Sequence, residues 1–163
     1  MDKTHIPLFV LRRVILKGTY TLLLTCDKPL RLRVGRVGQM LLKKGYYLYT
    51  GSALGIGGAS LERRVARHRR RTKPRRWHVD YLTGRPEIRV RHVVCLQSDR
   101  RLECQINQHI ISKLDAQPIG PHAGAMDCKC TAHLLSVKLH GGLPATLARL
   151  EEVYSDFGTP FSL

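Results

Sequence analysis

The chain has 163 residues, of which 43% are hydrophobic and 25% are charged. This composition is typical of a globular protein, and the length fits one domain with its own hydrophobic core. No segment approaches the roughly 20 apolar residues of a membrane helix, so we do not expect a membrane-spanning protein. The sequence is strongly basic, with a formal net charge of +16.

The positive charge is concentrated in the first part of the chain. Residues 1–99 contain 22 basic and 6 acidic residues, whereas residues 100–163 contain 6 of each. Because lysine and arginine displace counterions from phosphates, nucleic acid is the first expected partner and an anionic membrane surface the second. A basic face that is merely solvated is the alternative on charge alone.

Neither the N-terminus nor the cysteines indicate secretion. Residues 6–16 are apolar, but Arg12 and Arg13 interrupt them and no small-residue cleavage site follows, so a cytoplasmic protein is expected. Cys26, Cys95 and Cys104 lie in apolar runs, where a thiol packs as a small hydrophobe. A disulfide framework is therefore not expected.

The first half of the chain predicts three strands and a helix. Residues 18–25 (GTYTLLLT) and 30–34 (LRLRV) are predicted strands joined by a turn, and residues 45–51 (GYYLYTG) are a third, with Tyr47, Tyr49 and Gly51 on one face. We expect these three to form an antiparallel meander. A glycine-rich loop over residues 51–58 then leads into an arginine-rich helix at 61–70, which ends before Pro74.

The second half predicts a further alternation of helices and strands. A short helical segment at residues 77–82 precedes a strand at 88–96 and an amphipathic helix at 101–114, whose apolar residues recur every four positions. A last strand at 133–139 and a last helix at 144–154 follow. The expected fold is mixed α/β (α+β), a small antiparallel β-sheet flanked by helices, in one domain with its core at 18–114 and a tail at 115–163.

Two similar tripeptides, Gly18-Thr19-Tyr20 and Tyr49-Thr50-Gly51, are followed by Arg64 and His68 on one predicted helix and by Glu103 on the next. In order and spacing these residues resemble the GIY-YIG nuclease superfamily, and most closely its compact Uri-type branch, over residues 18–114. Gly18-Thr19-Tyr20 stands where the family has Gly-Ile-Tyr, and Tyr49-Thr50-Gly51 where it has Tyr-Ile-Gly. Arg64 and His68 follow at the family's spacing, and Glu103 falls where the family places its metal-binding glutamate. The connection between the two tripeptides is longer than in compact relatives, which suggests an extra hairpin or strand.

The resemblance implies an endonuclease that hydrolyses phosphodiesters with a single Mg²⁺ or Mn²⁺ ion, acting on DNA more than RNA, in DNA repair. Tyr20 would be the general base, while Tyr49 and His68 would position the water and help its proton leave. Arg64 would stabilise the phosphoryl charge, and Glu103 would hold the metal. No membrane partner is implied.

The same residues have a physical rationale and simpler alternatives. A tyrosine titrates near 10, so Tyr20 could act as a base only where a nearby cation such as Arg64 favours its ionised form. Arg64 and His68 are four apart and share a helix face, and Glu103 offers a hard oxygen ligand. Alternatively, the tyrosines pack, Arg64 is a plain phosphate contact and Glu103 is a surface residue. The chain would then be a non-catalytic basic nucleic-acid-binding module.

The main phosphate-contacting surface is expected at residues 61–76, which hold nine basic residues and one acid. Besides Arg64, its expected contacts are Arg63, Arg67, Arg69, Arg70, Arg71, Lys73, Arg75 and Arg76. Gly51, Ser52, His78 and Asp80 are candidates to line the cleft, although a core or helix-capping role is equally expected for the last two.

The tail carries a second group of polar residues. Cys128, Cys130 and His133 are of the types that ligate zinc, but the sequence offers no clear fourth ligand. We therefore expect them to pack and shape the cleft, and the purified protein to contain substoichiometric zinc.

Overall fold

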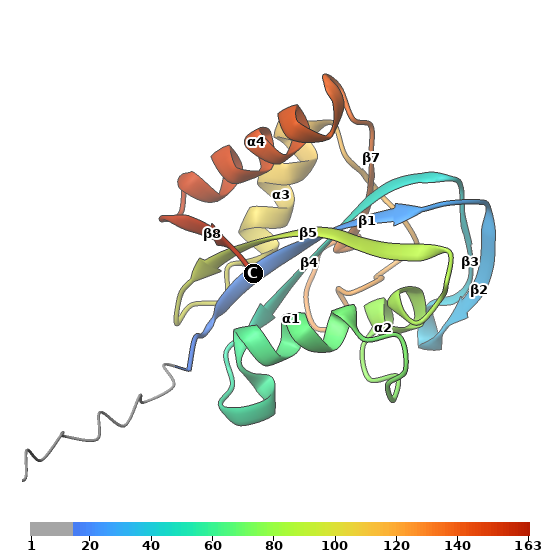
Figure 1. Cartoon of the computed structure of the whole chain (residues 1–163), viewed down its shortest axis with the longest axis horizontal. Helices are drawn as coiled ribbons and strands as arrows, with labels where there is room; N and C mark the ends of the chain where they lie inside the picture. The colour runs from blue at the N-terminus through green and yellow to red at the C-terminus, as the bar shows by residue number, and fades with distance from the viewer. Residues whose placement is uncertain (1–14) are drawn as a thin grey trace, which may run out of the picture.

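The computed structural model describes residues 15–163, so most of the apolar stretch at residues 6–16 lies outside the described part. Its centre is a six-stranded antiparallel sheet with the order β6-β7-β4-β1-β5-β8 (Figure 1). The strands are β1 (Gly18–Cys26), β4 (Gly45–Ala53), β5 (Ile88–Gln97), β6 (Gln117–Pro118), β7 (Leu134–Val137) and β8 (Pro160–Ser162). The expected mixed α/β class with an antiparallel sheet is confirmed.

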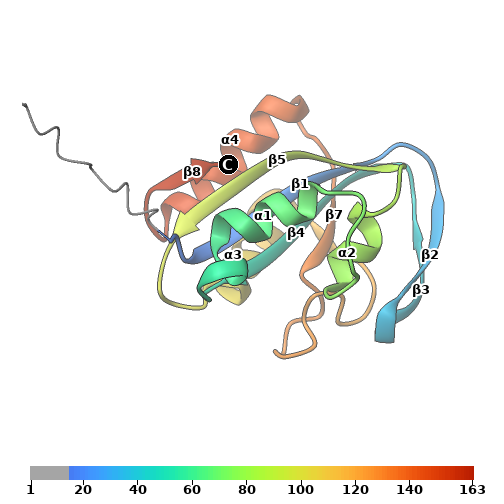
Figure 2. The same ribbon diagram turned by 60° about the horizontal axis from the view of Figure 1, so that its bottom comes forward.

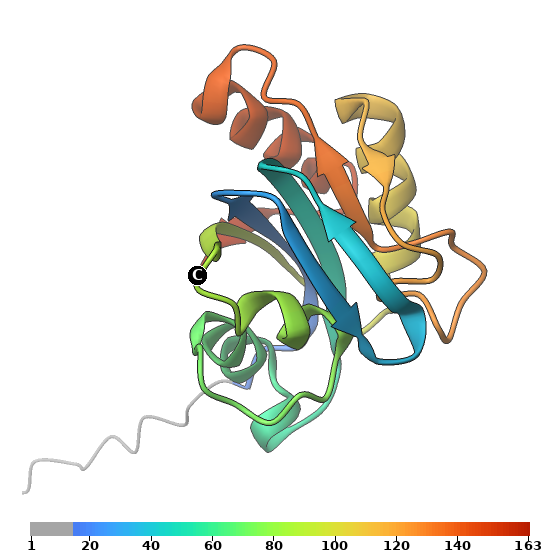
Figure 3. The ribbon, with the colours of Figure 1, turned by 90° about the vertical axis from the view of Figure 1, so that its right-hand side faces the viewer.

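Helices cover both faces of this sheet (Figures 1 and 3). One face carries α1 (Leu61–Arg69) and α2 (His78–Thr83), and the other carries α3 (Glu103–Leu114) and α4 (Gly142–Ser155). Each predicted helix is present, with ends that differ by a few residues. Within residues 15–163, no helix is both long and apolar enough to cross a membrane.

The central strand β1 brings the two tripeptides side by side. It pairs with β4 so that Tyr20 lies opposite Gly51 and Leu22 lies opposite Tyr49. Because strand side chains alternate between faces, Tyr20, Tyr47 and Tyr49 share the core beneath α1 and α2, whereas Leu23 packs on the side of α3 and α4. The predicted alternation of the tyrosines is confirmed.

The predicted meander is wrong, because β2 (Leu30–Val34) does not enter the main sheet. It forms a separate hairpin with β3 (Gly38–Leu42), which lies beside α2 at one end of the molecule (Figure 2). The hairpin buries the apolar residues of LRLRV against the core and exposes Arg31 and Arg33. It lengthens the connection between the two tripeptides, as the resemblance suggested.

Candidate active site

A cavity of about 330 Å³ opens beside the end of β4, and we call it the tyrosine cavity. It is lined by six of the site residues that were predicted from the sequence, which come from four separate segments: Tyr20, Tyr49, Gly51, Ser52, Arg64 and Glu103. Arg101, Asp127 and His133 also line it, and sequence reasoning gave none of them a part in catalysis. Asp127 and His133 come from the loop before β7. His133 was expected to help shape the cleft and does line it, whereas no sequence signal pointed to Asp127.

Gly51 makes room for the phenol of Tyr20 on the neighbouring strand. A Cβ atom at position 51 would lie 2.7 Å from the Tyr20 Oη atom and 2.9 Å from its Cζ atom. Because such contacts are too short for carbon, a side chain here would push the ring away. The second tripeptide therefore ends in glycine for a steric reason.

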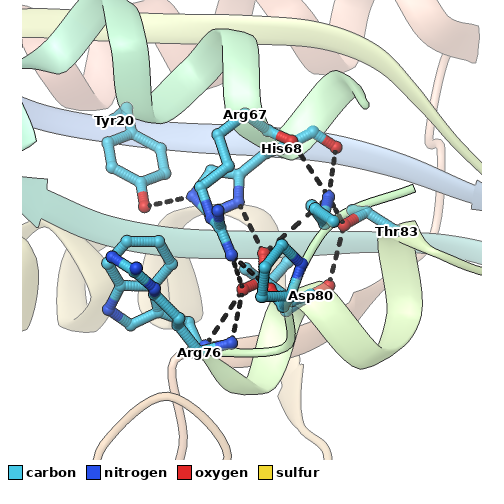
Figure 4. A network of polar contacts seen from close by, with 10 residues as sticks. Tyr20, Arg67, His68, Arg76, Asp80 and Thr83 are labelled. Atoms are coloured by element: carbon cyan, nitrogen blue, oxygen red, sulfur yellow. Dashed lines mark hydrogen bonds and ion pairs between the residues drawn. The ribbon is translucent and has the colours of Figure 1, made fainter. Parts of the chain in front are cut away.

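His68 lies behind Tyr20 and does not line the tyrosine cavity. The Tyr20 Oη atom is 2.8 Å from His68 Nε2, and the imidazole is buried (Figure 4). Burial lowers the pKa of His68, although Asp80 partly opposes this, so the ring is neutral near pH 7. With its proton on Nδ1, the ring accepts the Tyr20 hydroxyl proton at Nε2. The expectation that His68 faces the scissile group beside Arg64 is corrected, because its Nε2 atom contacts the Tyr20 hydroxyl instead.

Asp80 is buried beneath His68 and anchors this part of the site (Figure 4). Its Oδ1 atom lies 3.5 Å from His68 Nδ1, and its Oδ2 atom accepts hydrogen bonds from Arg67 and from the backbone amides of Arg76 and Trp77. Burial by itself raises the pKa of this carboxyl, but these contacts outweigh it and hold the pKa well below its usual range. Asp80 caps α2 and does not line the tyrosine cavity, so the helix-capping alternative is correct.

His78, the other doubtful cleft candidate, also lies outside the tyrosine cavity. Its Nδ1 atom accepts a hydrogen bond of 2.8 Å from the backbone amide of Gly124. It therefore fixes the loop before β7 against α2, and its assignment to the cleft is corrected.

Both tyrosines of the cavity are held in their protonated form. Burial raises the pKa of Tyr20 well above its ordinary value, and Arg64 lowers it only in part. Burial likewise raises the pKa of Tyr49. The expectation that Arg64 could favour a resting phenolate is therefore corrected, because desolvation of the phenolate outweighs the attraction of the guanidinium.

Arg64 reaches the cavity from α1 and is held on two sides. One of its terminal nitrogens donates a 2.8 Å hydrogen bond to the Ser52 carbonyl, and its guanidinium lies 4.3 Å from the centre of the Trp77 ring. The Arg64 Nε atom is buried and finds no hydrogen-bond partner among residues 15–163. The side chain is thus fixed in place with a donor still free.

Glu103, the first residue of α3, is buried, so the alternative of an ordinary surface glutamate is wrong. One Glu103 oxygen accepts a hydrogen bond from Ser52 Oγ, and the other forms an ion pair with Arg101. Arg101 also lies 2.7 Å from Asp127. Burial alone raises the pKa of Glu103, but the hydrogen bond from Ser52 and the Arg101 contact lower it, so the group is ionised at neutral pH. A cation thus already lies between two carboxylates of the cavity. Their hard oxygens and charge fit Mg²⁺ or Mn²⁺.

A second depression, the arginine groove, adjoins the tyrosine cavity and shares Arg64 and Trp77 with it. It has a volume of about 590 Å³. Its other arginines are Arg63, Arg67, Arg70 and Arg76. Of the remaining predicted phosphate contacts, Arg69, Arg71 and Arg75 are exposed on the surface.

One of the predicted phosphate contacts, Lys73, serves the interior instead, and a second, Arg67, does so in part. Lys73 Nζ donates to the carbonyls of Arg67 and His68 and to Thr83 Oγ1, and it lies 3.7 Å from Asp80. Its side chain is 2% exposed, so its assignment to the binding surface is corrected. Arg67 is largely turned inward as well, because it pairs with Asp80 at 3.1 Å.

Four potential metal ligands meet beside the tyrosine cavity, and we call them the Cys/His cluster. One donor atom each from Cys104, Cys128, Cys130 and His133 lies within 4.8 Å of the other three, so this group could hold a metal ion. The expectation that no fourth ligand exists is wrong, because Cys104 on α3 supplies it. Its place in an apolar helix concealed this role, which depends on the packing of α3 against the loop before β7.

Comparison with known proteins gives a family without an assigned activity. The family model described as "Domain of unknown function DUF123" matches residues 19–155, and the chain belongs to that family. No curated protein and no solved structure matches the chain.

Proposed function

We propose that this member of the DUF123 family is a metal-dependent endonuclease of the GIY-YIG kind, related to the Uri-type branch, that hydrolyses DNA phosphodiester bonds. One observation carries the proposal: Tyr20, Arg64 and Glu103, from β1, α1 and α3, line one cavity. A proton acceptor, a cation and a hard metal ligand are the groups that phosphodiester hydrolysis needs.

The arginine groove supports the choice of substrate. It lies along α1 and shares Arg64 and Trp77 with the tyrosine cavity, and its guanidinium groups match the repeated negative charge of a nucleic-acid backbone. Arg64 belongs to both depressions, so it would contact the scissile phosphate and stabilise the charge that grows on its oxygens. DNA is proposed over RNA, and repair as the setting, from the resemblance alone.

Glu103 would hold the Mg²⁺ or Mn²⁺ ion. In the structure, the positive charge of Arg101 is paired with both Glu103 and Asp127. When bound, the metal would supply a Lewis acid that neutralises phosphate charge and favours deprotonation of water. Arg101 must release Glu103 for this to happen. Its side chain is 58% exposed and is therefore free to turn into solvent.

The buried chain of Tyr20, His68 and Asp80 gives the proton a path. As the attacking water loses its proton to the Tyr20 oxygen, the tyrosine passes its own hydroxyl proton to His68 Nε2. The imidazolium that forms is stabilised by the ionised Asp80 next to Nδ1. Tyr20 stays uncharged throughout, which agrees with the high pKa that burial gives it.

The alternative is a non-catalytic nucleic-acid-binding module, which the arginine groove would equally suit. The substitution Glu103→Gln separates the two, because glutamine keeps the side-chain shape but lacks the charge that a hard divalent cation requires. With Mg²⁺ or Mn²⁺, cleavage of labelled single-stranded, duplex and flapped DNA should fall at least about a hundredfold, while DNA binding persists.

Glu152→Gln is the matched control, because Glu152 is exposed on α4 and its substitution removes the same charge from a residue that does not line the cavity. This variant should cleave at the wild-type rate. A wild-type protein that binds DNA but cuts none of these substrates with either metal would establish the binding module. Equal cleavage by the wild type and Glu103→Gln would remove Glu103 from the mechanism.

A further inference from the structure

We propose that Cys104, Cys128, Cys130 and His133 form a closed structural zinc site that fixes the loop before β7 against the first turn of α3. Three thiols and one imidazole are a common ligand set for structural zinc. The four donors come from two separate segments, one on α3 and one between β6 and β7.

Two distances within the Cys/His cluster match those of a tetrahedral zinc site. With Zn–S near 2.3 Å and Zn–N near 2.0 Å, tetrahedral geometry requires S···N separations of about 3.6 Å. His133 Nε2 lies 3.6 Å from Cys128 Sγ and 3.7 Å from Cys104 Sγ. One imidazole nitrogen thus lies from two thiols of different segments at the separation that two ligands of one tetrahedral zinc ion have.

Ordinary packing or a disulfide does not account for this arrangement. A disulfide would bring two sulfurs to about 2.05 Å, whereas all five cysteines are free. His133 is buried, and thiols are weak hydrogen-bond partners for a buried imidazole nitrogen. Each of the four groups gains a strong partner only if a cation lies between them.

The surrounding contacts also fit a built site. Gln108, one turn after Cys104, places its Nε2 atom 3.9 Å from Cys130 Sγ, as a donor that supports a metal-bound thiolate would. Asn107 Nδ2 donates to the Ala132 carbonyl at 2.9 Å, next to His133. Because all four ligands come from the protein, no position remains for substrate, and the role is structural.

The zinc site would determine the shape of the tyrosine cavity, and this step rests on the proposed function. Cys104 directly follows Glu103, and Asp127 directly precedes Cys128, so the ion would hold the two carboxylates of the cavity in place. The same loop packs Gly124 against Tyr49, where a Cβ would lie only 2.8 Å from the ring. Loss of zinc should therefore loosen the wall that faces the tyrosines.

Elemental analysis of the whole chain, purified under reducing conditions without chelator, should find about one zinc ion per chain. Cys104→Ser and Cys128→Ser should each lose most of it. Cys26→Ser is the control, because Cys26 lies outside the Cys/His cluster and a serine there can keep the hydrogen bond to the Lys28 carbonyl. Should either cluster variant fail to fold, replacement of zinc by Co²⁺ in the wild type should give the visible absorption of tetrahedral cobalt thiolate.

Hydrogen exchange gives a second readout that needs no cleavage. Removal of zinc by a chelator should increase exchange at residues 119–133 and at the start of α3, and leave α1 unchanged. A wild-type protein with five intact thiols that takes up neither zinc nor cobalt would overturn the proposal, as would full zinc content in both cluster variants. Neither measurement involves DNA, so inactivity of the enzyme would not affect them.

Discussion

Asp80→Asn should strongly destabilise the protein, because it removes a buried charge that several donors share. The side chain of Asp80 is 0% exposed and lies within 3.1 to 3.7 Å of Arg67, His68 and Lys73. Removing one partner from a buried ion pair costs about 3 to 5 kcal/mol. For a chain of this length that corresponds to a fall in Tm of about 6 to 20 °C.

The stability lost in Asp80→Asn should be larger at neutral pH than at acidic pH. The contacts of Asp80 hold its carboxyl pKa well below its usual range, so its stabilising contribution is complete above the unfolded value near 4 and falls as the pH drops below it. The difference in free energy of unfolding between wild type and Asp80→Asn should therefore be full at pH 7 and smaller at pH 3. Urea unfolding followed by circular dichroism at both values measures it.

Asp99→Asn is the control, because Asp99 is exposed and should change stability by no more than about 0.5 kcal/mol. A difference of less than about 1 kcal/mol between Asp80→Asn and the wild type at pH 7 would refute the reasoning. It would mean that the donors around Asp80 find other partners without cost. The positioning of His68 by Asp80 would then have no energetic basis.

Two further predictions concern DNA binding and the position of Tyr20. The triple variant Arg63→Ala, Arg70→Ala and Arg76→Ala should reduce the slope of log affinity against log salt by about two to three units. In the control, alanine replaces Arg31, Arg33 and Arg36 on the β2–β3 hairpin, and the slope should change by less than about one unit. Equal slopes for the two triple variants would exclude the arginine groove as the DNA contact. Gly51→Ala should lower cleavage about tenfold to a hundredfold with DNA affinity unchanged, because the new methyl displaces Tyr20. Ser155→Ala, at an exposed position near the end of α4, should cleave normally, and normal cleavage by Gly51→Ala would show that Tyr20 tolerates the shift.

The sequence predicted those parts of the fold that local pattern determines. The apolar repeat of α3 and the alternation of Tyr47 and Tyr49 each depend on neighbouring residues, and both predictions hold. The pairing of β2 was missed because the pattern LRLRV identifies a strand and its buried face but not its partner. The strands β6 and β8, with two and three residues, are too short to show any period.

The candidate site shows the same division. Motif spacing brought Tyr20, Arg64 and Glu103 to one cavity, but it could not tell that His68 lies behind Tyr20. Asp80 and Lys73 belong to a basic, polar segment, and only tertiary packing shows that both are buried against each other. Cys104 was read as a packing residue, because its partners lie more than twenty positions away along the chain.

The outer edge of β5 has a consequence for self-association. Among residues 15–163, β8 pairs with this edge only along Val94–Leu96, so the stretch from Arg89 to Val93 has no strand partner on its outer edge. An antiparallel pairing of two copies centred on Val90 would place Arg89 of each opposite Arg91 of the other, and like charges directly opposed across strands repel. Charged edge strands resist aggregation in this way. Arg89 and Arg91 would thus oppose this edge-to-edge pairing, a role for basic charge that is separate from the proposed contact with DNA.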